Sequence, residues 1–180
     1  TVFNASIKEF LNKKEQLSDY FNNDIKEDIF DYIPPQETNQ IYTPKAIVKM
    51  MVDILEEENP NIFYDQNAKF IDLYTKSGLF ITEIVTRLYD GLKGQFSDDY
   101  SRIKWIIEKQ VYAVAPSNIS YNISKKFIMG SIEGVSDENI VECDMARLAK
   151  ENNVAEKIKQ LYGDDDMKFD VILGNPPYQE

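Results

Sequence analysis

Hydrophobic and polar positions follow one another along the chain with two different periods. Short apolar runs bounded by polar residues predict buried strands at 69–73, 111–114, 139–142 and 169–173. Apolar residues that recur every three or four positions predict helices at 78–92, 118–129 and 151–162, and a further helix that Ser97 caps and that carries Ile103, Ile106 and Ile107. Strands that alternate with helices favour an α/β fold with a Rossmann-like parallel sheet and right-handed crossovers.

A separate helical pattern precedes these elements. Its apolar residues share one face between Val2 and about Ile33, and Pro34-Pro35 ends it. We therefore expect residues 1–37 to form a helical extension and residues 38–180 to form the α/β domain. After a loop, Thr43-Pro44 predicts a helix N-cap followed by proline at the first helical position. The apolar positions of that helix are Ile47, Val48, Met51 and Leu55.

Composition narrows the chemistry that this domain can perform. The chain has 180 residues, of which 43% are hydrophobic, and no run of 18 apolar residues predicts a membrane span. It has no histidine and one cysteine, Cys143, which excludes Ser-His and Cys-His pairs, histidine metal ligands and an internal disulfide. The acidic run 164–166 predicts a solvated turn, because carboxylates in a row cannot all face one ion. We expect a cytoplasmic, metal-free protein without a signal peptide or membrane attachment.

The most informative motif follows the last predicted strand. Asn175 offers a side-chain carbonyl as a hydrogen-bond acceptor. Pro176 disfavours the helical region for Asn175, and Pro177 does the same for Pro176, so the backbone is held extended and a main-chain carbonyl faces outward. Tyr178 adds a flat ring just beyond. Two acceptors beside an aromatic plane predict a receptor for a planar ring that carries an exocyclic amine.

A hydrophobic strand followed by Asn-Pro-Pro-Tyr resembles the catalytic motif of the S-adenosylmethionine-dependent DNA adenine amino-methyltransferases. The resemblance implies that Asn175 and the Pro176 carbonyl accept hydrogen bonds from the adenine amine, while Tyr178 stacks on the flipped-out base. It makes Asn175, Pro176, Pro177 and Tyr178 the expected catalytic residues for methyl transfer from S-adenosylmethionine to that amine. The other interpretation is a strand that ends in a rigid turn with a surface aromatic residue.

The segment from Phe70 to Phe80 resembles the cofactor motif of the same family, Phe-Leu-Asp-Pro-x-Cys-Gly-Ser-Gly-x-Phe. The matching positions include Asp72, Ser77, Gly78 and Phe80. The resemblance implies that Asp72 meets the methionine ammonium, directly or through water, and that Gly78 lets the backbone approach the methionine closely. The other interpretation is an ordinary strand-to-helix turn, which commonly uses these residue types.

Two more segments extend the resemblance to the region from about residue 41 to residue 178. Thr43-Pro44 resembles a Thr-Pro step whose backbone lies near the methionine in this family. Asp144 stands where the family often accepts the adenine amine of the cofactor, although an exposed aspartate after a strand is ordinary. The expected cofactor-binding residues are therefore Thr43, Pro44, Asp72, Ser77, Gly78 and Asp144. This order of motifs resembles restriction–modification methyltransferases that place target recognition after the catalytic domain.

Two residues depart from the family pattern. Lys76 stands where the family has its first glycine, and its side chain either obstructs the pocket or pairs with the cofactor carboxylate. Ala115 stands at the end of the second strand, where the family usually has an acid that holds both ribose hydroxyls. Losing that charge-assisted hydrogen bond weakens cofactor binding roughly ten- to a hundredfold. Ser117 and Asn118 are candidates to compensate.

The net charge of −11 argues against this segment gripping DNA by its phosphates, and Lys125-Lys126 is a modest basic cluster. We expect double-stranded DNA to be bound by parts of a longer protein, which can include target-recognition or cleavage domains. We interpret the chain as a fragment, with a sheet incomplete on its C-terminal side, that is inactive alone. The alternative is a degenerate methyltransferase-fold domain that acts as a scaffold or DNA-docking module without cofactor. A dinucleotide oxidoreductase is disfavoured because Gly-x-Gly-x-x-Gly is absent from the first turn.

Overall fold

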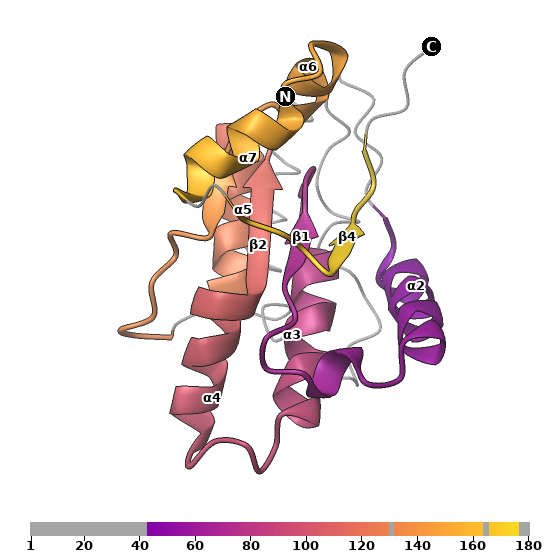
Figure 1. The fold of residues 1–180 in the computed structure, drawn as a ribbon, viewed down its shortest axis with the longest axis vertical. Helices are drawn as coiled ribbons and strands as arrows, with labels where there is room; N and C mark the ends of the chain where they lie inside the picture. Colours follow the sequence, from indigo (N-terminus) through magenta and orange to yellow (C-terminus); the bar gives the residue numbers. More distant parts are fainter. Residues whose placement is uncertain (1–42, 130–131, 164–165, 177–180) are drawn as a thin grey trace, which may run out of the picture.

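The computed structural model describes residues 43–129, 132–163 and 166–176, apart from the side chains of Phe127 and Met129. Four parallel strands form one sheet in the order β3-β2-β1-β4 (Figure 1). The strands are β1 (Phe70–Asp72), β2 (Val111–Ala115), β3 (Ile140–Glu142) and β4 (Val171–Leu173). The predicted α/β class with a parallel sheet is confirmed. The expected helical extension, residues 1–37, lies outside the described residues.

Helices cover both faces of the sheet, so its central strands are buried on both sides. Along β2, Val111 and Ala113 belong to the core cluster shared with α3 (Leu79–Gly91) and α5 (Asn118–Met129). The intervening Tyr112 and Val114 belong to a second cluster. That cluster is covered by α6 (Met145–Lys150) and α7 (Val154–Tyr162), which cross in front of the sheet in Figure 1.

The remaining elements lie around this core. They are α2 (Lys45–Glu58), the 3₁₀ turn Ile62–Tyr64, α4 (Asp99–Trp105) and the π-helical turn Ile106–Gln110 that leads into β2. The predicted cap of α4 is wrong by one residue: Asp98 accepts the N–H of Ser101 at 2.7 Å, and Ser97 donates its hydroxyl to Asp98. An aspartate carboxylate is a strong N-cap acceptor, which accounts for the difference.

The predicted helix 151–162 begins three residues later, as α7 (Val154–Tyr162), and a separate short helix that was not predicted, α6 (Met145–Lys150), precedes it. Asn152 has a left-handed backbone (φ 55°), which interrupts the helical path between α6 and α7. Asp144 is the N-cap of α6 and accepts the N–H of Arg147 at 3.2 Å. The solvated turn predicted for the acidic run 164–166 includes Asp164 and Asp165, which lie outside the described residues.

The apolar face of α2 differs from the prediction. Val48 and Val52 are buried against α3, whereas Ile47 and Met51 are about two-fifths exposed. Arg87 of α3 pairs with Asp53 and Glu56 of α2, so ion pairs as well as apolar contacts hold the two helices together. None of the helices in the described part of the chain is both long and apolar enough to cross a membrane.

Candidate functional site

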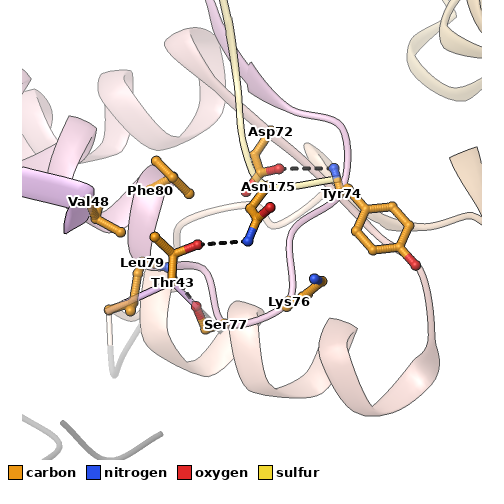
Figure 2. A pocket seen from close by; sticks show the side chains of 9 residues that line it. All are labelled: Thr43, Val48, Asp72, Tyr74, Lys76, Ser77, Leu79, Phe80 and Asn175. Carbon is orange, nitrogen blue, oxygen red and sulfur yellow. Dashed lines mark hydrogen bonds between the residues drawn. The ribbon is translucent and has the colours of Figure 1, made fainter. Parts of the chain in front are cut away.

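Two neighbouring strands bring the predicted cofactor and catalytic motifs together. β1 and β4 run parallel, with Asp72 in register with Leu173, so the loops that follow them leave the same edge of the sheet. A pocket opens there (Figure 2). It is lined by Thr43, Val48, Asp72, Tyr74, Lys76, Ser77, Leu79, Phe80 and Asn175. Four of the predicted site residues are among them, namely Thr43, Asp72, Ser77 and Asn175.

Asp72 is the charged group at the bottom of this site. Its side chain is buried at the end of β1, where its Oδ1 accepts the backbone N–H of Tyr74 at 2.9 Å. Burial raises the pKa of Asp72 to about 7, against the opposing effects of the Tyr74 N–H and the positive charge of Lys76. A cation bound beside this carboxyl group would stabilise its ionised form, because a nearby positive charge favours the carboxylate.

Gly174 provides the space that the Asp72 carboxylate occupies. It has a positive φ of 145°, and a Cβ atom at this position would lie 2.4 Å from Oδ1 of Asp72. The glycine therefore lets the end of β4 pass directly over the carboxylate. Gly174 was not singled out from the sequence, and its contact with Asp72 was missed.

Thr43 and Asn175 meet across the mouth of the pocket. The Nδ2 atom of Asn175 donates a hydrogen bond to Oγ1 of Thr43 at 3.1 Å. The prediction that Thr43 caps a helix is wrong, because Pro44 is the N-cap of α2 and no side-chain cap is present there. Pro44 is exposed and holds the helix start through its carbonyl, which accepts the N–H groups of Ile47 and Val48.

The turn between β1 and α3 is built around Ser77 and Gly78. Ser77 is buried in the pocket wall, and its Oγ accepts the N–H of Leu79 at 3.4 Å. Gly78 is the N-cap of α3 in a left-handed conformation (φ 81°), and a Cβ atom on it would lie 3.1 Å from the Cα of Ser124 in α5. The glycine is needed for both the turn and its packing.

Lys76 and Tyr74 form the side of the pocket that faces away from Thr43 (Figure 2). Lys76 is only 8% exposed, and its Nζ lies 5.4 Å from the centroid of the Tyr74 ring. Burial lowers the pKa of Lys76, and the attraction of Asp72 opposes that shift. Lys76 is the departure from the family pattern that the sequence shows, whereas Tyr74 was not predicted, although an aromatic residue just after a strand is a readable signal.

Asp144 and Ala115 lie outside this pocket. Asp144 is exposed and caps α6, yet its charge acts on Tyr74, whose pKa is raised first by burial and then by Asp144. Ala115 is fully buried and in register with Glu142 of β3. Asn118 donates its amide to the Glu142 carboxylate at 3.2 Å, so an acid stands one strand away from the expected position.

The other three expected catalytic residues are not found in the pocket that the structure describes. Pro176 is exposed and does not line the pocket, while Pro177 and Tyr178 lie outside the described residues. Within the ranges that the structure describes, no group of three or more His, Cys, Asp or Glu side chains is placed to hold a metal ion.

Comparison with known proteins points to one kind of enzyme. Residues 109–180, which run from just before β2 through the Asn-Pro-Pro-Tyr motif, match the family model of the Eco57I restriction-modification methylase. An uncharacterized adenine-specific methylase of Mycoplasma pneumoniae (strain ATCC 29342 / M129 / Subtype 1) is 23% identical, over 86% of this chain and 49% of that protein. The chain is thus similar to adenine methyltransferases of restriction–modification systems.

Two solved structures of such systems share the fold. A nuclease-deletion mutant of the Type ISP restriction-modification enzyme LlaGI, in complex with a DNA substrate mimic, has a TM-score of 0.59 and 23% identity, over 84% of this chain and 14% of that one. The ATP-dependent Type ISP enzyme LlaBIII bound to DNA has a TM-score of 0.54 and 22% identity, over 79% and 11%. The resemblance to adenine methyltransferases predicted from the sequence is confirmed. The chain spans about half the length of the curated relative that it matches.

Proposed function

We propose that the protein containing this chain transfers a methyl group from S-adenosylmethionine to the exocyclic amine of adenine in DNA, as part of a restriction–modification system. The observation that carries the proposal is the shared pocket of Asp72 and Ser77, from the β1 turn, with Asn175, from the end of β4. A group that holds a cofactor and a group that accepts a base amine must lie side by side for methyl transfer.

The pocket suits the amino-acid end of such a cofactor. The pocket is small, with a cavity volume of about 20 Å³, so it takes only a part of such a cofactor. The buried Asp72 carboxyl offers an acceptor for an ammonium group, and Ser77 adds a hydroxyl group. When bound, S-adenosylmethionine supplies a methyl group on a positively charged sulfur.

Asn175 is the residue that we assign to the base. Because its Nδ2 is engaged by Thr43, its Oδ1 is the end of the amide that remains directed away from Thr43 (Figure 2). An acceptor at this point, together with the Pro176 carbonyl, would hold both hydrogens of the adenine amine and leave the nitrogen lone pair available for attack. This is catalysis by positioning and electrostatics, and it requires no histidine or cysteine.

Access to the amine inside duplex DNA requires the adenine to be flipped out of the stack, and we assign Tyr178 to stack on it. The net charge of −11 supports the proposal that most phosphate contacts come from other parts of the protein. We further propose that the chain is inactive alone and that the protein is cytoplasmic.

A second candidate function is a degenerate methyltransferase domain that docks on DNA as a scaffold. Ala115 favours it, since this buried residue gives the end of β2 no acid for a ribose. DNA binding by the full-length protein without cofactor binding would select this candidate.

The test is methylation of DNA by the full-length protein carrying Asn175→Ala, with N6-methyladenine measured after digestion of the DNA to nucleosides. We expect turnover to be lost. Asn67→Ala, at an exposed turn before β1, is the matched control and should keep wild-type activity. Unchanged turnover in Asn175→Ala would remove the assignment.

A further inference from the structure

Lys76 is an unusual residue to find inside a pocket. Lysine is almost never fully buried unless its charge is paired, yet Lys76 is only 8% exposed and lines the cavity with Asp72. Asp72 is the last residue of β1, and Lys76 stands four positions later, within the turn that leads to α3. A positive and a negative side chain therefore line the same small pocket.

The surroundings of Lys76 keep its ammonium group at the pocket wall. The ring of Tyr74, whose centroid is 5.4 Å from Nζ, offers a cation–π contact. The negative charge of Asp72 attracts the same ammonium, and the attraction acts on both groups. The backbone N–H of Tyr74 also donates to the Asp72 carboxylate, so the main chain beside the ring is tied to the acidic side of the pocket.

We propose that Asp72 and Lys76 together bind the α-amino-acid end of the cofactor, with Asp72 accepting hydrogen bonds from its ammonium group and Lys76 donating to its carboxylate. This inference rests on the proposed function, and of the two roles left open for Lys76 it selects pairing with the cofactor carboxylate over obstruction of the pocket. A zwitterion brings one charge for each member of the pair, so the ligand replaces one internal attraction with two charge-assisted contacts. Both partners stay neutralised, which a buried charge requires.

If Lys76 instead obstructed the pocket, the protein would show a different preference among ligands with and without a carboxylate. A lysine that merely fills the space of a glycine would weaken every ligand alike, with or without a carboxylate. A lysine that binds the carboxylate makes affinity depend on that one group. Decarboxylated S-adenosylmethionine keeps the adenosine, the sulfonium and the amine but lacks the carboxylate, so it separates the two roles.

The experiment is calorimetric titration of the full-length protein with S-adenosylmethionine and with its decarboxylated form. Wild type should prefer S-adenosylmethionine roughly ten- to a hundredfold, as for one charge-assisted hydrogen bond. Lys76→Met should lose that preference by weakening S-adenosylmethionine alone, and Lys76→Arg should retain most of it. Lys93→Met, at an exposed position beyond α3, is the matched control and should behave as wild type. Circular dichroism checks that each variant is folded.

Two results would overturn the assignment while leaving the proposed function standing. One is equal affinity of wild type for the two ligands. The other is tighter binding of both ligands by Lys76→Met, which would show that the lysine obstructs the site. Failure of wild type and Lys76→Met to bind either ligand would overturn the proposed function and the assignment together.

Discussion

The amide of Asn175 is held by the hydroxyl of Thr43, from which it is 132 positions distant in the sequence. Thr43 stands at the entrance to α2, and Asn175 follows β4, at the edge of the sheet (Figure 1). The bond fixes which end of the amide faces the pocket. In our account Thr43 is thus a positioning residue for the group that accepts the base amine.

Thr43→Val should lower kcat for DNA methylation with little change in the KM for S-adenosylmethionine. Valine has nearly the same shape but cannot accept the amide hydrogen, and one such bond is worth about 1 kcal/mol, or roughly fivefold to tenfold in rate. Thr43→Ser, which keeps the hydroxyl, should restore kcat. A fall in kcat that serine does not rescue would show that the threonine acts through packing instead.

Gly174→Ala should destabilise the fold by about 1–3 kcal/mol in urea unfolding. The added methyl group would collide with Oδ1 of Asp72, and the positive φ of Gly174 strains any other residue. Gly94→Ala is the control, since Gly94 also has a positive φ (92°) but has open space where a Cβ would stand. Equal losses in the two variants would mean that the Asp72 contact contributes nothing.

Asp72→Asn should change how stability depends on pH. Because burial raises the pKa of Asp72 to about 7, the folded state holds a proton that the unfolded chain, with a pKa near 3.8, has released. The stability contributed by Asp72 is therefore complete below about pH 4 and is lost as pH rises to about 7. Lys76 is the charged neighbour that opposes this loss.

The measurement is the free energy of unfolding of wild type and Asp72→Asn between pH 4 and pH 8. The free energy of unfolding of Asp72→Asn, relative to that of wild type, should increase up to about pH 7 and stay constant above it. Asp90→Asn, at an exposed position on α3, should follow the wild-type profile. Parallel profiles for wild type and Asp72→Asn would contradict the account of a buried, proton-binding carboxyl group.

Arg87→Met should loosen α2 from α3 and so disturb the position of Thr43. Arg87 pairs with Asp53 and Glu56 of α2 and, at 3.0 Å, with Glu83 of its own helix. Its removal leaves three carboxylates close together, and we expect the free energy of unfolding to fall by about 1–3 kcal/mol. Faster hydrogen exchange in α2 is the expected signature. The exposed Arg147→Met should change neither quantity, and an Arg87→Met variant that matched it would refute the proposed link between the helices.

Much of the site follows from sequence because parallel strands place their carboxyl ends at one edge of a sheet. The turn after Asp72 and the motif at Asn175 could be assigned to the same pocket once the strands were recognised. Gly78 was also readable, since a strand-to-helix turn with a left-handed residue favours glycine.

Other features depend on contacts between distant segments and left no local signal. Thr43 looks like a helix cap next to Pro44, but its partner is Asn175. Gly174 is required by the side chain of Asp72, on another strand. The short helix α6 was missed because its six residues are too few for a clear periodic pattern, and its start depends on the cap at Asp144.

The most direct test of the central claim is calorimetric titration of the full-length protein with S-adenosylmethionine, compared with its Asp72→Ala variant. A cofactor site at the carboxyl ends of β1 and β4 predicts saturable binding of one molecule by wild type and at least a tenfold loss in the folded variant. Absence of saturable binding by wild type at millimolar cofactor, or undiminished binding by Asp72→Ala, would contradict the account.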